Sequence, residues 1–151
     1  MTGQLKGIAF SAAVALVAAA FVVSGPERQG QSRFPICAGC HQSNGRGMPG
    51  TFPPLAGSEI ATGSPEIPVR IVLHGLQGPL TVRGQRFNGT MPAWGQFSDA
   101  DIAATLTYVR SQWGNSASVV TPAQVTAVRQ ATAGRNRAWT GAEIEALLRG
   151  R

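Results

Sequence analysis

The sequence predicts an all-α protein, in which a small helical domain lies between an apolar amino-terminal segment and a helical carboxy-terminal extension. Four segments open with residues that cap helices well, at Ser64, Ser98, Thr121 and Thr140. The 151 residues include 19 glycines and 10 prolines, so much of the chain must be loop. A small, loop-rich domain needs a further source of stability at its centre.

The most informative stretch is Cys37-Ala38-Gly39-Cys40-His41, which has the spacing of a covalent c-type haem attachment site. Two thiols three positions apart lie on one side of a helical turn and can both reach one edge of a porphyrin. The histidine that follows then lies beneath the ring and offers its imidazole to the iron. The small Ala38 and Gly39 leave room for the macrocycle. The motif therefore predicts one covalently bound haem c, with His41 as an iron ligand.

Three other interpretations of the two cysteines fit the sequence less well. A thioredoxin-like redox pair requires a βαβ pattern, and no such pattern surrounds Cys37. A zinc site could be counted from Cys37, Cys40, His41 and His74, but the adjacent Cys40 and His41 point in different directions. A disulfide between the two cysteines would close a short, strained loop and stabilise little. Haem attachment is the favoured interpretation.

A second iron ligand must come from elsewhere in the chain, and Met91 and His74 are the candidates. Met91 lies in a loop of sequence Asn-Gly-Thr-Met-Pro-Ala-Trp over residues 88–94. His74 ends a predicted helix, where the helix dipole alone favours a histidine. Met48 lies only seven residues beyond His41, too near to reach the opposite face of the ring, and is expected to be a packing residue.

Three blocks of sequence, in this order, resemble those of class I monohaem cytochromes c. They are the motif at 37–41, the Phe-Pro-Pro-Leu-Ala-Gly segment at 52–57, and Met91-Pro92-Ala93-Trp94 followed by a predicted helix over 98–113. The resemblance covers about residues 31 to 114. It is to bacterial forms that act as electron carriers or as haem subunits of membrane oxidoreductases. It implies a cytochrome c fold and favours Met91 over His74 as the second ligand.

The resemblance also implies which residues surround the haem. The expected pocket residues are Pro53, Leu55, Arg83, Arg86 and Trp94. The Pro53 carbonyl is expected to accept the Nδ1 proton of His41, and Leu55 to pack on the haem. The two arginines, in an ordered loop or short hairpin over 78–90, are expected near the propionates. Trp94 is expected either to donate its indole N–H to a propionate or to pack in the core.

The chain divides into four predicted parts. They are an export signal or transmembrane anchor over 1–25, a tether over 26–31, a cytochrome c domain over 32–114 that begins with a helix near Ser32, and a helical extension over 115–151. Residues 7–25 carry no charge and follow Lys6, which suits either a cleaved signal or a retained anchor. Both place the haem domain on the periplasmic side of the cytoplasmic membrane, and the anchor is favoured. The extension is expected to pack on the domain or on a partner.

The net charge of +6 comes from an excess of arginine. It predicts either a solvated surface or a basic face that steers the protein onto acidic redox partners. Nucleic acid is not an expected partner, because no basic run with interleaved aromatic residues is present.

The sequence thus predicts a one-electron carrier between membrane redox complexes, with no small-molecule substrate. The alternative is a non-catalytic haem subunit of a larger membrane-bound dehydrogenase or oxidase. An enzyme or gas-binding cytochrome would require that Met91 be displaced.

Overall fold

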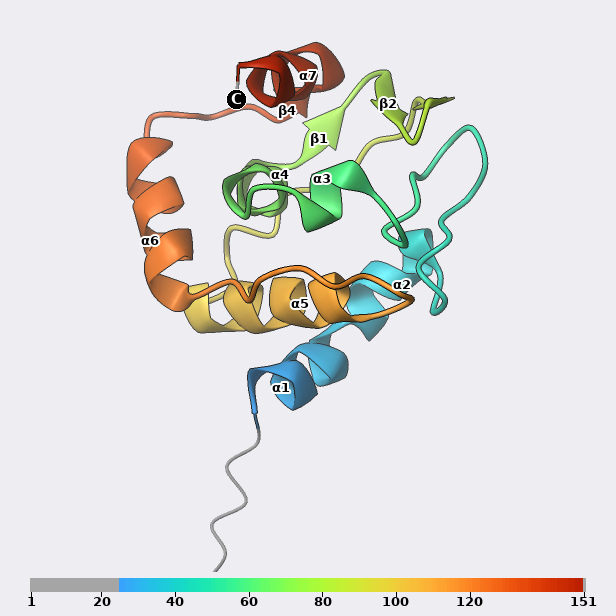
Figure 1. Cartoon of the computed structure of the whole chain (residues 1–151). Helices are drawn as coiled ribbons and strands as arrows, with labels where there is room; N and C mark the ends of the chain where they lie inside the picture. The colour runs from blue at the N-terminus through green and yellow to red at the C-terminus, as the bar shows by residue number, and fades with distance from the viewer. Residues whose placement is uncertain (1–24, 151) are drawn as a thin grey trace, which may run out of the picture.

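The computed structural model describes residues 25–150, which form seven helices and four short strands (Figure 1). The helices are α1 (Pro26–Arg33), α2 (Pro35–His41), α3 (Glu59–Thr62), α4 (Glu66–His74), α5 (Asp99–Ser111), α6 (Pro122–Ala131) and α7 (Gly141–Arg149). The strands are β1 (Leu76–Gln77), β2 (Leu80–Val82), β3 (Gln85–Phe87) and β4 (Trp139–Thr140). The chain is mostly helical, as predicted.

Helix α1 corrects the predicted tether, because residues 26–31 lie within it. This helix packs against α5, on the lower side of the molecule in Figure 1. An ideal Cβ on Gly30 would lie 2.1 Å from the Ala104 carbonyl oxygen, so only glycine allows the two helices to approach this closely. A second helix, α2, starts at Pro35 rather than near Ser32, since a proline has no N–H to continue the hydrogen bonds of α1.

Helix α5 forms as its sequence predicts. The Ser98 side chain caps it by accepting a hydrogen bond from the Asp101 backbone N–H at 3.1 Å. Ile102, Leu106 and Val109 are buried on one face. The helix ends at Ser111, so Trp113, the last residue of the predicted helix, lies beyond it.

Helices α3 and α4 lie between the haem motif and the strands. Helix α3, which was not predicted from the sequence, is a single turn whose N-cap is Ser58. Helix α4 was expected to start from the pair Ser64-Pro65, and it begins one residue later, with Pro65 itself at the N-cap. It ends at His74, directly before Gly75, as predicted.

The four strands make two small sheets. Strands β2 and β3 form an antiparallel hairpin, which confirms the expected hairpin within residues 78–90. Leu80, Val82 and Phe87 are buried on one side of this hairpin. Strand β1 pairs in parallel with β4, so Leu76 lies opposite Trp139 of the carboxy-terminal extension.

The extension packs on the rest of the domain (Figure 1). Helices α6 and α7 each begin with the predicted capping box, at Thr121 and Thr140. Helix α6 lies against α4 and α5, where Arg129 forms a 2.8 Å ion pair with Asp99. Helix α7 contacts β2. Of the two expected arrangements, the structure therefore has the one in which the extension covers the domain itself.

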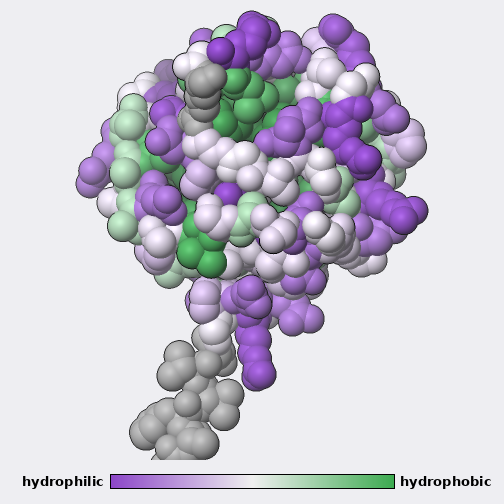
Figure 2. Space-filling view, in the orientation of Figure 1, coloured by the Kyte–Doolittle hydropathy of each residue, from purple (hydrophilic) through white to green (hydrophobic). Residues whose placement is uncertain are grey.

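The predicted apolar helix at the amino terminus lies outside the described residues, apart from its last position, Gly25. Among residues 25–150, no helix has the length and apolar character needed to cross a membrane. The face of the molecule in Figure 2 is mostly polar, with apolar surface confined to a few areas, one of them near α7 at the top.

Candidate functional site

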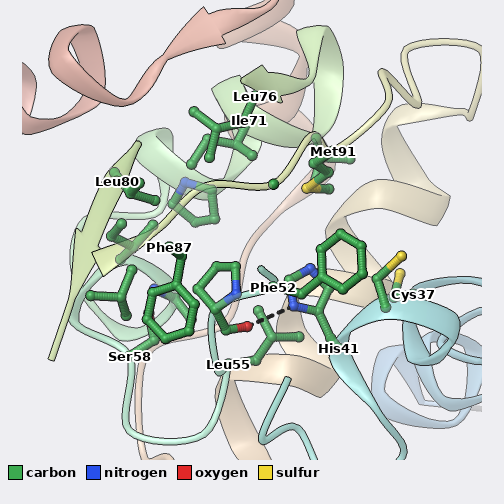
Figure 3. A pocket seen from close by; sticks show the side chains of 18 of the residues that line it. Cys37, His41, Phe52, Leu55, Ser58, Ile71, Leu76, Leu80, Phe87 and Met91 are labelled. Atoms are coloured by element: carbon green, nitrogen blue, oxygen red, sulfur yellow. Dashed lines mark hydrogen bonds between the residues drawn. The ribbon is translucent and has the colours of Figure 1, made fainter. Parts of the chain in front are cut away.

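An apolar cavity opens at the centre of the domain (Figure 3). Its walls come from α2, the loop over residues 51–55, α4, strands β1 to β3, the loop over 89–94, and α5. The cavity holds about 1180 Å³ of empty space, counted with its mouth. It is therefore a large, hydrophobic space reached by residues from most of the domain.

His41 is buried in the wall of this cavity, with 9% of its surface exposed. Its Nδ1 lies 2.9 Å from the Pro53 carbonyl oxygen, the bond drawn in Figure 3. A carbonyl can only accept, so Nδ1 carries the proton and Nε2 keeps its lone pair. Burial lowers the pKa of His41, which keeps the imidazole neutral. The side chain thus presents a nitrogen that can bind a metal.

Cys37 and Cys40 line the same cavity one helical turn apart, and both are free thiols. The disulfide alternative is therefore not what the structure has. Burial raises the pKa of the Cys37 thiol, and the nearby Cys40 raises it further. Among residues 25–150, no group of three His, Cys, Asp or Glu side chains could hold a metal ion, so the zinc alternative lacks its geometry.

Met91 enters the cavity from the side opposite His41; Figure 3 shows Met91 above and His41 below. Its backbone is fixed by Leu76, which donates to the Met91 carbonyl at 3.0 Å and accepts from the Met91 N–H at 2.8 Å. An imidazole and a thioether thus face a single apolar space from two walls. Two thiols lie beside the imidazole. This set of donors fits a covalently attached haem with two axial ligands.

Comparison with known proteins agrees with this geometry. The family model described as Cytochrome c matches residues 28–113. The chain belongs to the cytochrome c family. Its cofactor is accordingly one covalently bound c-type haem, and its class is electron-transfer protein rather than enzyme.

Several curated proteins are similar to this cytochrome c chain. Cytochrome c-552 of Thermus thermophilus is 42% identical over 97 residues, which span 62% of this chain and 74% of that protein. The cytochrome c subunit of a quinone alcohol dehydrogenase from Gluconacetobacter polyoxogenes is 36% identical over 97 residues, but these span only 20% of that subunit. The cytochrome c subunit of a gluconate 2-dehydrogenase from Pantoea cypripedii is 33% identical over 98 residues, 22% of its length.

His74, the other candidate for the second ligand, lies away from the haem cavity of this cytochrome c. It is not among the residues that line the cavity. Its Nε2 is 2.7 Å from the Thr132 hydroxyl, which itself donates to the Val128 carbonyl at 2.7 Å. Since the hydroxyl proton is already used, His74 must be the donor in its bond to Thr132.

The other pocket residues expected from the sequence divide into two groups. Pro53, Leu55 and Trp94 line the cavity. Arg83 and Arg86 are exposed and lie outside the lining. The Arg83 backbone N–H donates to Glu59, and its guanidinium lies 3.5 Å from the Ala56 carbonyl. A contact of either arginine with haem propionates remains a prediction.

Much of the apolar wall was not anticipated from the sequence. These residues come from the loop over 51–55, α4, β1 and the hairpin: Phe52, Pro68, Ile71, Leu76, Leu80, Val82 and Phe87. The alternation of apolar and polar residues in the hairpin, with Leu80 and Val82 on one side, is a signal that could have found part of this wall.

Proposed function

We propose that this cytochrome c carries single electrons between redox proteins, with His41 and Met91 as the two axial ligands of its haem. The proposal is carried by one observation, which is that these two side chains face the apolar cavity from opposite walls. A haem held there supplies reversible one-electron chemistry at its iron.

The chain's own residues set the conditions for that chemistry. The Pro53 carbonyl holds His41 in one tautomer and orientation and makes its imidazole a stronger donor. The thioether of Met91 is a soft ligand that favours the ferrous state and raises the potential relative to a second imidazole. With both positions filled, no site is left for a substrate. The apolar wall keeps water from the bound group.

Carbon monoxide tests the ligand assignment. The reduced protein should bind the gas only slowly, whereas Met91→Ala should bind it rapidly because one axial position is open. Met48→Ala is the matched control, since Met48 is 43% exposed and does not line the cavity. Rapid binding by the unaltered protein, or equal binding by both variants, would contradict Met91 as a ligand.

The proposed place of action is the outer side of the cytoplasmic membrane, among membrane redox complexes with acidic docking surfaces. The net charge of +6 supports such partners, because opposite charge steers the encounter. Retention of residues 1–25 as an anchor belongs to the same proposal. The intact mass of the mature protein tests it directly, since it reports both the covalent haem and the presence of this segment.

A fixed haem subunit of a larger dehydrogenase is the second candidate. It is supported by the similarity to cytochrome c subunits of an alcohol dehydrogenase and a gluconate dehydrogenase. Size-exclusion chromatography of a detergent extract, followed by haem absorbance, separates the two functions. A free carrier should elute near the mass of the single chain, and a haem peak found only at high mass would favour the subunit.

A further inference from the structure

A second hollow lies in the carboxy-terminal extension, between the end of α6, strand β4 and α4. Its empty volume is about 720 Å³ including the open side, and its charged lining residues are Arg70, Arg135 and Arg137. Thr132, Asn136 and Trp139 supply most of the rest of the wall. No residue lines both this hollow and the haem cavity. The two are separate sites.

The Trp139 ring holds two of the three arginines in place. The Arg135 guanidinium carbon lies 3.6 Å from the centroid of this ring, and that of Arg70 lies 5.6 Å from it. Arg135 is further fixed by bonds to the Ala138 carbonyl at 2.9 Å and to Glu143 at 2.8 Å. Two guanidinium groups from distant parts of the chain are thereby brought to one wall.

Positive charge in the hollow exceeds the negative charge beside it. Glu143 is shared between Arg135 and Arg137, and Arg137 keeps 60% of its side chain exposed. Glu66, one turn before Arg70 on α4, is exposed. Even with both carboxylates counted, the three arginines leave an excess of one positive charge.

Two observations on neighbouring groups agree with this excess. Burial is the largest cause that lowers the pKa of His74, and the charges of Arg135, Arg129 and Arg70 lower it further. The imidazole therefore lies in the positive field of two arginines of the hollow, Arg135 and Arg70, and of Arg129 beside it. The Arg70 Nε is buried without a hydrogen-bond partner.

We propose that this hollow binds a small oxyanion of the sulfate or phosphate class between Arg70, Arg135 and Arg137. Guanidinium groups suit such a ligand because their planar N–H donors pair with two oxygens at once. The Trp139 ring and the ion pairs with Glu143 already hold the arginines in position, so binding requires little further ordering of side chains. The site is independent of the proposed electron transfer, since it shares no residue with the haem cavity.

His74 provides the measurement. The sequence contains only two histidines, and His41 is bonded through its Nδ1 and is expected to bind iron through its Nε2. In the reduced protein, His74 is therefore the histidine whose ring proton signals should titrate by NMR. Sodium sulfate is the probe, because its charge does not change over the titration. Sodium chloride at equal ionic strength is the reference.

Sulfate should raise the pKa of His74 in a saturable way that chloride does not reproduce, because a bound anion favours the charged imidazole. Arg70→Met and Arg137→Met should each weaken the apparent affinity about tenfold or more, by removing a charged hydrogen bond. Arg137 is mostly exposed, so its replacement leaves the fold intact. Arg28→Met, at an exposed position on α1, should change nothing.

The proposal is overturned if sulfate and chloride shift the His74 titration equally at matched ionic strength. It is also overturned if the Arg137 variant, folded and haem-loaded, keeps the full sulfate response. Calorimetry with sulfate on the same proteins should give a matching affinity.

Discussion

Leu76 and Met91 exchange two backbone hydrogen bonds, of 3.0 and 2.8 Å. The same Leu76 lies opposite Trp139 in the parallel pair of β1 and β4, where the backbone N–H of Trp139 donates to the Gly75 carbonyl at 3.0 Å. The loop that carries the proposed sulfur ligand is thus connected through one short strand to the carboxy-terminal extension. The position of Met91 depends on residues on both sides of that strand.

Gly75→Ala should weaken the proposed bond between Met91 and the haem iron. Gly75 has a φ of +80°, and an ideal Cβ there would lie 2.6 Å from the Met91 carbonyl oxygen. The side chain would be strained and would also push the loop away, so the proposed Met–iron bond should break at a lower denaturant concentration. Carbon monoxide binding to the reduced protein, followed along a urea series, measures this. Gly84→Ala is the control, because Gly84 also has a positive φ, of +72°, has nothing within 4 Å of the added Cβ, and does not line the cavity.

Gly47→Ala should raise the midpoint potential. An ideal Cβ on Gly47 would lie 2.6 Å from the Pro53 carbonyl oxygen, the group that accepts the His41 proton. Displacing this carbonyl weakens that bond, which makes the imidazole a poorer donor to ferric iron. A redox titration of the variant against Gly50→Ala, where the added Cβ meets nothing within 4 Å, tests the effect. A potential that stays equal in the two variants would contradict this role for Pro53.

Arg110→Met should destabilise the fold by about 3 kcal/mol, because buried carbonyl groups lose their donors. Arg110 is 1% exposed and donates to the carbonyls of Ala61, Gly63 and Ser118 at 2.6 to 2.9 Å. Urea denaturation of the haem-loaded protein gives the free energy of unfolding. Arg28→Met, at an exposed position, should lower the free energy of unfolding only slightly. An equal decrease in both variants would show that the buried hydrogen bonds of Arg110 do not add to stability.

Acid should loosen the extension through Glu143. The pKa of this carboxyl is lowered from 4.5 to about 2, first by its hydrogen bond with Arg135 and then by the Thr140 backbone N–H. A depressed folded-state pKa contributes stability above about 4.5, and this contribution is lost as the pH falls toward about 2. The NMR signal of the Trp139 indole should report the change. Glu143→Gln should remove this pH dependence, whereas Glu27→Gln, at an exposed position on α1, should retain it.

The parts of the fold that sequence could predict are those fixed by local chemistry. The caps at Ser98, Thr121 and Thr140 each require only a hydroxyl and the next turn of backbone, and all three were predicted correctly. The spacing of Cys37, Cys40 and His41 is likewise a local property, and it indicated the cofactor.

The parts that were missed depend on contacts between distant residues. Helix α1 has a polar composition that is typical of a linker, and its packing depends on how closely Gly30 approaches Ala104 of α5. The pairing of Leu76 with Trp139 joins two-residue strands that carry almost no pattern of their own. The hollow at Arg70 and Arg135 likewise exists only because β4 returns to lie beside β1.

Helix α1 also limits how this protein could move if residues 1–25 stay in a bilayer. A flexible six-residue linker over 26–31 would span about 13 Å on average and let the haem domain turn freely. Those residues are instead packed against α5, so the folded body begins directly after Gly25, the last position of the apolar segment. In a membrane-held form, the haem domain would therefore start close to the lipid surface, with no flexible six-residue linker to carry it outward.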